Sequence, residues 1–244
     1  MKELTNKMQQ NMVVHSSRCD NTAKLAFPEI FKTFMDLTGI HAADLGYGAD
    51  DLDKKGLFWV ISKIKIKIYD RPKMMDEVLL TTWPEKPERI RCNRYSTITS
   101  DGKTLVEGKT EWLMIEKATG RIHKVADAYP MDMDHLEDKV CSEPFVRINK
   151  DDFIECGRMQ EYVVKSTDID FVQHMNNVAY VKLVMDLFSC KEIEDMSISE
   201  MEVAYKEQCY EGETLTLKIK RADGAIKIGI FKDNDTLACS VLIR

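Results

Sequence analysis

The chain contains two copies of one sequence pattern, and this repeat restricts the fold more than any other feature of the sequence. Residues 13–37 (VVHSSRCDNTAKLAFPEIFKTFMDL) align without a gap with residues 163–187 (VVKSTDIDFVQHMNNVAYVKLVMDL), at an offset of 150. Two shorter matches follow in the same order, at offsets of 136 and 132: residues 68–81 with 204–217, and residues 100–105 with 232–237. Three ordered matches predict a duplicated unit whose first copy has longer loops.

Each copy predicts the same order of elements. Apolar residues recur every three or four positions in residues 30–45 and 177–188, which is typical of a helix that buries one face. Pro28 suits the first turn of the earlier helix, because its missing N–H is not needed there. After the helix the period changes to two, most clearly in residues 63–68, where lysine alternates with isoleucine. This alternation predicts a half-buried strand with one lysine face.

Turn residues separate the later alternating segments. Ser100-Asp101-Gly102 and Asp223-Gly224 favour tight turns, so these strands are expected to form antiparallel hairpins. Each copy is then a β-α-β-β-β-β unit, with a curved antiparallel sheet around one helix. We expect a first unit over residues 1–126, a connection over the acidic residues 127–160, and a second unit over residues 161–244.

Composition excludes several classes of protein. The 244 residues carry 35 basic and 41 acidic side chains, a net charge of -6, which argues against a nucleic-acid partner bound by bulk electrostatics. Seven cysteines without a C-x-x-C pair indicate neither a disulfide framework nor a zinc site, and they suit a reducing cytoplasm. The polar N-terminus, MKELTNKMQQNMVV, does not resemble a signal peptide, and no apolar run approaches the length that spans a bilayer.

Polar and titratable residues cluster where the second copy enters its helix, over residues 168–180. The cluster includes Asp170, His174, Asn176 and Asn177, whereas the first copy has neither the histidine nor the asparagines at the equivalent positions. Residues that only cap a helix would serve both copies equally well. The asymmetry therefore favours a specialised site in the second copy.

The pattern D-x-D-x-x-x-H-[VM]-N-N-x-x-Y over residues 168–180 resembles the hotdog-fold thioesterases, and the tandem arrangement is similar to the acyl-ACP thioesterases of plants and bacteria. Residues 56–60 look like that family's GLxWV segment, residues 76–84 like its DxVxxxTWP, and residues 205–209 like its Y-[KR]-x-E-[CA]. The resemblance covers nearly the whole chain, from residue 13 to residue 244.

This resemblance implies an α+β double hotdog that hydrolyses acyl-[acyl-carrier-protein] thioesters in fatty acid biosynthesis. It implies that the second repeat is catalytic, that the first shapes the acyl pocket, and that no metal or organic cofactor is needed. Paired repeats would replace the dimer of single hotdogs, so the protein is expected to be a monomer or a homodimer.

The sequence departs from the family pattern at two positions. Val172 stands where the acyl-ACP branch usually has asparagine, and Gln208 stands where it commonly has a catalytic glutamate. Single-domain acyl-CoA relatives lack that asparagine, so its loss need not abolish hydrolysis. Three other functions stay open: an acyl-CoA thioesterase, a catalytically weak acyl-binding protein, and a hotdog dehydratase.

The chemistry can be argued from residue types. A thiol is a good leaving group, so the enzyme mainly has to activate water and polarise the carbonyl. Asp170, just before a helix, can act as general base or as nucleophile, with His174 orienting water or sharing the proton. Free N–H groups near Met175 to Asn177 suit a developing oxyanion. Gln208 can orient water but cannot act as a base.

Simpler explanations exist for these residues. Asp170 and Asn176 can be helix caps, and His174 can be a buried core histidine. Cys209 could form a nucleophilic pair with His174, although its neighbours offer little activation. His15, Cys19 and Asp20 lack a fourth metal ligand.

Two further sets of residues concern the substrate and its carrier. We expect Asn176, Trp59 and Met35 to contact the substrate, although Trp59 and Met35 also suit a core and Asn176 a loop-closing role. Lys63, Lys65 and Lys67 form the best candidate patch for an acidic acyl carrier protein. The alternative for these lysines is an ordinary solvated strand face.

Overall fold

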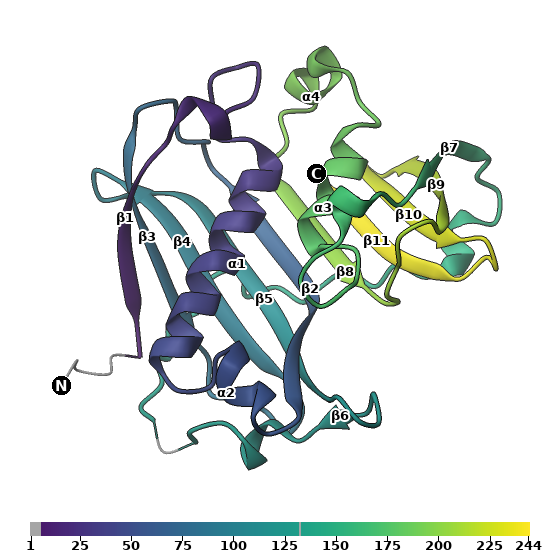
Figure 1. Ribbon diagram of the computed structural model, residues 1–244. Helices are drawn as coiled ribbons and strands as arrows, with labels where there is room; N and C mark the ends of the chain where they lie inside the picture. Colours follow the sequence, from purple (N-terminus) through teal and green to yellow (C-terminus); the bar gives the residue numbers. More distant parts are fainter. Residues whose placement is uncertain (1–5, 132) are drawn as a thin grey trace. The chain divides into compact units, whose positions relative to one another are not determined.

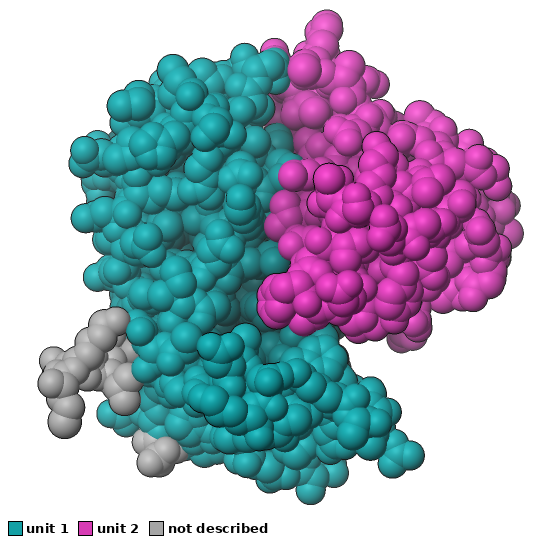
Figure 2. All heavy atoms as spheres, in the orientation of Figure 1, with its two compact units in different colours: residues 1–142 teal, residues 143–244 magenta. Residues whose placement is uncertain are grey.

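The structure is a computed structural model that describes residues 6–131 and 133–244. The chain divides into two compact units, residues 1–142 and 143–244 (Figure 2). The N-terminal segment that the sequence predicts to be no signal peptide begins in residues 1–5, which lie outside the described residues. No helix in the described part of the chain is long and apolar enough to cross a membrane.

The first unit is an antiparallel sheet with a long helix across one face (Figure 1). Its strands pair in the order β1-β3-β4-β5-β2, and the short β6 pairs with β5. The elements are β1 (Met8–Val13), α1 (Phe27–Asp44), α2 (Ala49–Asp53), β2 (Leu57–Ile68), β3 (Glu77–Pro84), β4 (Cys92–Ser100), β5 (Lys103–Glu116) and β6 (Ile122–His123).

Helix α1 follows the predicted pattern but starts three residues earlier than its apolar period, at Phe27. Pro28 lies in its first turn, as predicted. The helix packs closely on the sheet, because a Cβ atom at Gly108 of β5 would lie 2.5 Å from the ring of Phe34. It ends before Gly46, whose φ of +77° reverses the chain at little cost.

The second unit repeats this architecture. Its strands pair antiparallel in the order β7-β9-β10-β11-β8, the same order as in the first unit when each strand is matched to its counterpart. The elements are β7 (Arg158–Val163), α3 (Asn177–Met185), α4 (Cys190–Met196), β8 (Glu200–Tyr205), β9 (Thr214–Ala222), β10 (Ala225–Lys232) and β11 (Leu237–Ile243). The predicted α+β fold of two hotdog repeats is therefore confirmed, with the short helices α2 and α4 added.

Two predicted details of the second unit need correction. Helix α3 ends at Met185 and not at residue 188, because Leu187 and Phe188 bond to carbonyls three residues back and Ser189 then caps α4. The second and third of the sequence matches are also displaced, each by one residue. Tyr69 and Lys206 each donate to an equivalent carbonyl, those of Leu105 and Ala238, so the offsets are 137 and 133.

The hairpins form where the turn residues predict them. Asp101 and Gly102 join β4 to β5, and Asp223 and Gly224 join β9 to β10, all with positive φ. Part of the predicted connection belongs to the second unit, because Ile148 and Phe153 pack into a buried cluster with residues of β10 and β11.

The lysine face of β2 is not uniformly exposed, and the prediction of an exposed patch is wrong at Lys65. This side chain is 2% exposed. Lys63 pairs with Glu111 of β5 at 3.0 Å, and Cys141, itself buried, bonds to the backbone of Lys67. The alternation of β2 is as predicted, but a period of two cannot reveal that a later segment lies along the polar face.

Candidate active site

The loop that enters α3 holds Asp170 and His174 in one tight turn. The Asp170 N–H donates to the His174 carbonyl at 2.9 Å, and the Gln173 N–H donates to the Asp170 carbonyl at 3.0 Å. Gln173 adopts a φ of +66°, which closes the turn. Because both bonds use backbone atoms, they fix the two positions whatever their side chains are.

The Asp170 carboxylate is half-buried and bonded on one side only. Its Oδ1 atom accepts the Val172 N–H at 3.0 Å, the geometry of an Asx turn. Among the described residues no donor reaches Oδ2, so this oxygen can accept a proton or attack a carbon. Val172, 39% exposed, adds no polar group beside it.

Tyr210 connects His174 to Gln208. The rings of His174 and Tyr210 meet edge to face with centroids 5.2 Å apart, and the Tyr210 hydroxyl donates to Oε1 of Gln208 at 3.1 Å. The two predicted site residues, His174 and Gln208, therefore contact the same tyrosine. The Gln208 amide N–H groups remain able to donate, which suits the predicted orienting role.

Lys232 is the charged residue of this region that the sequence analysis missed. Its Nζ atom donates to the Gln208 carbonyl at 3.0 Å and pairs with Glu213 at 2.8 Å. Burial lowers the pKa of Lys232, but the hydrogen bond and charge of Glu213 outweigh it and raise the pKa. Lys232 is recognised only in the structure, where the end of β10 lies beside this loop. Nothing near position 232 in the sequence marks it.

The prediction of free amides at Met175 to Asn177 is wrong for two of the three. The Met175 N–H donates to the Cys209 carbonyl at 2.8 Å, and the Asn176 N–H donates to the Asp168 carbonyl at 2.7 Å. The loop folds back on its own start and on the following loop, which sequence spacing does not show. Asn177 is the one of the three whose N–H has no acceptor among the described residues.

Asn176 acts as the N-cap of α3. Its side-chain oxygen accepts the Val178 N–H at 2.8 Å. A role in substrate binding stays a prediction for this residue.

Cys209 is a poor candidate for a nucleophile. It is 0% exposed, and burial raises the pKa of its thiol although a hydrogen bond with Tyr180 acts in the opposite direction. A protonated, buried thiol does not attack a thioester at neutral pH.

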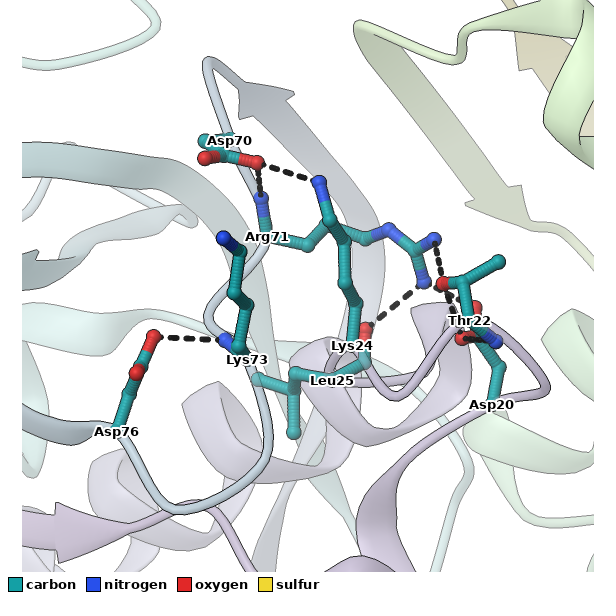
Figure 3. A network of polar contacts seen from close by, with 8 residues as sticks. All are labelled: Asp20, Thr22, Lys24, Leu25, Asp70, Arg71, Lys73 and Asp76. Carbon is teal, nitrogen blue, oxygen red and sulfur yellow. Dashed lines mark hydrogen bonds and ion pairs between the residues drawn. The ribbon is translucent and has the colours of Figure 1, made fainter.

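The first unit has the same loop with different chemistry (Figure 3). The Asp20 N–H donates to the Lys24 carbonyl at 2.9 Å, and the Ala23 N–H donates to the Asp20 carbonyl at 3.0 Å. These bonds match those of Asp170, His174 and Gln173 at an offset of 150.

The Asp20 carboxylate, unlike that of Asp170, is fully engaged. Arg71, the counterpart of Gln208 at an offset of 137, donates from Nη1 to Asp20 Oδ2, while Thr22 donates from its N–H and hydroxyl to Oδ1 at 2.9 and 2.6 Å. Burial opposes ionisation of Asp20, but the hydrogen bonds from Thr22 and Arg71 outweigh it and lower its pKa. The first copy of the site is therefore a closed ion pair.

Met35 and Trp59 both lie in the first unit. Met35 is half-buried on α1, while Phe34 and Leu37 beside it are core residues. Trp59 is half-buried on β2, and its Nε1 donates to the Tyr47 carbonyl at 3.0 Å. Contact of Met35 and Trp59 with substrate stays a prediction.

Comparison with known proteins gives two family matches. Residues 5–132 match the acyl-ACP thioesterase N-terminal domain, and residues 152–244 match the acyl-ACP thioesterase C-terminal domain. A palmitoyl-acyl carrier protein thioesterase of Gossypium hirsutum is 23% identical over 210 residues, covering 82% of this chain and 49% of that protein. An oleoyl-acyl carrier protein thioesterase of Coriandrum sativum is 24% identical over 196 residues, covering 74% of this chain and 53% of its own length. The chain spans about half the length of these curated relatives.

Solved structures share the fold along the whole chain. An acyl-ACP thioesterase from Bacteroides thetaiotaomicron superposes with a TM-score of 0.88 at 21% identity, covering 100% of this chain and 99% of that one. A 12:0-ACP thioesterase from Umbellularia californica gives a TM-score of 0.84 at 16% identity, covering 98% and 97%. With both of its domain models matched in order, the chain belongs to the acyl-ACP thioesterase family.

Proposed function

We propose that this protein hydrolyses acyl-[acyl-carrier-protein] thioesters to a free fatty acid and the carrier thiol, with Asp170 as the catalytic base or nucleophile. The observation that supports this most is the contrast between the two copies of the loop. Arg71 and Thr22 donate to both oxygens of Asp20, whereas within the described ranges no donor reaches Oδ2 of Asp170. Family membership supports the same reaction.

Asp170, His174 and the Asn177 N–H each have a separate role in the proposed reaction. Asp170 takes a proton from water that attacks the carbonyl carbon, or attacks that carbon itself to give an anhydride that water then cleaves. His174 orients the water or shares its proton. The C–S bond breaks, and the thiolate takes up a proton to leave as the carrier thiol. The Asn177 N–H is the backbone donor left for the oxyanion.

The first unit shapes the acyl pocket in this proposal, with Trp59 and Met35 along it. The acidic carrier protein docks through the cations of β2 that reach solvent, Lys63 and Lys67, without the buried Lys65. The cysteine usage of the sequence supports a cytoplasmic place for the reaction, in fatty acid biosynthesis.

The test is thiol release from a panel of acyl-ACPs of different chain lengths, with the matched acyl-CoAs beside them. We expect wild type to turn over acyl-ACPs in preference to acyl-CoAs, and Asp170→Asn to lose at least about a hundredfold in kcat. Asp20→Asn, the same change in the closed copy, is the matched control and should keep wild-type turnover. Equal rates for Asp170→Asn and wild type would overturn the assignment.

A catalytically weak acyl-binding protein is the second candidate, because Val172 and Gln208 place no ionisable group beside Asp170. It predicts binding of acyl-ACP without release of thiol by wild type. Faster turnover of acyl-CoA than of acyl-ACP would instead identify an acyl-CoA thioesterase.

A further inference from the structure

Tyr210 contacts several side chains of the proposed site, although the residue is 44% exposed. Its ring meets the His174 ring edge to face, with the ring planes at 71°, and its hydroxyl donates to Oε1 of Gln208. The Nζ atom of Lys232 lies over the ring, 5.5 Å from its centre, which is within the range of a cation–π contact. A tyrosine that served only the core would be buried more deeply. Hydrophobic packing therefore does not account for this arrangement.

Glu213 fixes Tyr210 in its loop. Oε2 of Glu213 accepts the Tyr210 N–H at 3.0 Å, and the Glu213 N–H donates to the Tyr210 carbonyl at 3.1 Å. The other oxygen of this carboxylate, Oε1, pairs with Lys232 at 2.8 Å. One side chain thus holds both the backbone of Tyr210 and the cation over its ring, which restricts where the ring can lie.

The first unit has the same turn without the aromatic residue. At the offset of 137, Lys73 stands at the position of Tyr210 and Asp76 at that of Glu213. The Lys73 N–H donates to Oδ2 of Asp76 at 2.8 Å, and the Asp76 N–H donates to the Lys73 carbonyl at 3.0 Å. The turn therefore forms equally well with a lysine, and its backbone does not need the tyrosine.

The neighbour of the aromatic residue also differs between the units. Lys24, the counterpart of His174, forms a backbone bridge with Lys73. Its ammonium group pairs instead with Asp70 at 2.8 Å (Figure 3). The common backbone thus places these two positions side by side, and only the second unit fills them with two rings in contact. The aromatic pair of His174 and Tyr210 occurs in the copy that carries the proposed reaction.

The His174 ring needs such a contact to stay in place. The residue is half-buried, and no described residue forms a hydrogen bond with either nitrogen of its ring. A group that orients water must keep its position, because a displacement of about 1 Å can cost about a hundredfold in rate. The Tyr210 ring restricts His174 through an aromatic contact, which leaves the ring nitrogens to water and substrate.

We propose that Tyr210 is a positioning residue for the hydrolysis: its ring holds His174 in one rotamer, and its hydroxyl holds the amide of Gln208. This rests on the proposed function, in which His174 and Gln208 orient the attacking water. Because the hydroxyl engages Oε1 of Gln208, the amide N–H groups are the ones left to donate. Glu213 and Lys232 in turn keep Tyr210 in place.

The first measurement needs no substrate. The five histidines of the whole protein are isotope-labelled, and vicinal NMR couplings report the side-chain rotamer of each. His174 is assigned as the signal that disappears in His174→Ala. Tyr210→Phe keeps the ring, whereas Tyr210→Leu removes it. We expect one rotamer of His174 in wild type and Tyr210→Phe, and averaged couplings in Tyr210→Leu. Lys73→Leu, the same change in the turn of the first unit, is the matched control and should leave His174 in one rotamer.

Thiol release from acyl-ACP then tests the ring. Tyr210→Phe and Tyr210→Leu both lack the hydroxyl, so their difference reports the ring alone. We expect kcat of Tyr210→Leu to be at least about tenfold below that of Tyr210→Phe, with KM values within about twofold of each other. With His174→Ala added to both, the difference should shrink to less than about twofold, since no histidine is left to hold. Lys73→Leu should keep wild-type kcat.

The hydroxyl is tested in the same assay. Tyr210→Phe should lower kcat about threefold, the size of one hydrogen bond between neutral groups. When Gln208→Met is present in both proteins, the change at position 210 should have no further effect, because the acceptor of the hydroxyl has been removed.

Two results would overturn the inference: a single His174 rotamer in folded Tyr210→Leu, or a loss of kcat from the ring that is as large without His174 as with it. If Tyr210→Leu does not fold, Tyr210→Lys takes its place, because lysine stands in the same turn of the first unit. Failure of the proposed function would look different. Wild type would release no thiol from any acyl-ACP, while the rotamer of His174 would still show whether Tyr210 holds it.

Discussion

Arg71 donates from its guanidinium to the Asp20 carboxylate, and in the second unit the counterparts of these two residues are Gln208 and Asp170. The backbone of the loop is the same in both units, since equivalent N–H groups donate to equivalent carbonyls. The two units therefore share the backbone conformation of this loop and differ in the side chains that it carries. In the first unit an arginine donates to the aspartate, whereas in the second unit no donor of the described residues reaches Oδ2 of Asp170, the oxygen that the proposed hydrolysis uses.

The two aspartates should separate stability from activity. Asp20→Asn leaves Arg71 half-buried with a weaker acceptor, so we expect it to lower the free energy of unfolding by about 1–3 kcal/mol and to leave thiol release unchanged. Asp170→Asn should leave the free energy of unfolding close to that of wild type and should lose thiol release. Urea unfolding and kcat of both variants check this. Loss of kcat in well-folded Asp20→Asn would contradict the structural role of the first copy.

The Asp20 ion pair should also appear in acid unfolding. Because the folded pKa of Asp20 lies below that of an unfolded aspartate, about 3.9, its ionised form contributes stability above that pH. This contribution is lost as the pH falls through the folded pKa. The difference in unfolding free energy between wild type and Asp20→Asn should thus be equal at pH 7 and pH 5 and shrink towards pH 3. A difference that grows in acid would show that the ion pair does not stabilise the fold.

Packing of α1 on its sheet can be tested at two glycines. Gly108→Ala places a Cβ atom 2.5 Å from the Phe34 ring, which is itself 1% exposed, so we expect a loss of about 1–3 kcal/mol in the free energy of unfolding. Gly39→Ala on the exposed side of α1 meets no atom within 4 Å and should gain up to about 1 kcal/mol. Thermal unfolding of the two variants measures both. Equal stability of Gly108→Ala and wild type would show that the helix lies further from β5.

Local patterns predicted the elements of this fold well, because they depend on neighbours in the sequence. The repeat, the helix that contains Pro28 and the hairpin turns at Asp101 and Asp223 all follow from spacing and residue type. Helix ends were less accurate, since the last turn of α3 tightens before Ser189 caps α4.

Contacts between distant residues could not be predicted in the same way. The sequence placed Asp170 and His174 together where the second copy enters its helix, but it did not show that Tyr210 joins His174 to Gln208 or that Lys232 approaches from β10. Nothing near Arg94 in the sequence predicts its burial either, because the residue is buried only where α1 packs against β4.

Lys65 and Lys63 should respond differently to charge reversal. Lys65→Glu places an anion at a site that is 2% exposed, so it should lower the free energy of unfolding by several kcal/mol, on the order of 3. Its effect on turnover would then report folding and not docking. Docking is tested by Lys67→Glu, which should raise KM for acyl-ACP about tenfold and leave KM for acyl-CoA unchanged. An equal rise for both substrates would place the carrier protein elsewhere.

Variants of Asn176 can separate its structural role from a role in substrate binding, because its side chain caps α3 beside the proposed site. Asn176→Ala removes the acceptor of the Val178 N–H, so we expect a loss of about 1 kcal/mol in stability. Asn177→Ala is the matched control, since the Asn177 side chain makes no hydrogen bond among the described residues. Replacement by aspartate restores the cap while removing the amide donor. If Asn176→Asp recovers both stability and KM, the residue only caps the helix. If it recovers stability while KM for acyl-ACP stays raised, the amide itself contacts the substrate, which is the role that the sequence predicts.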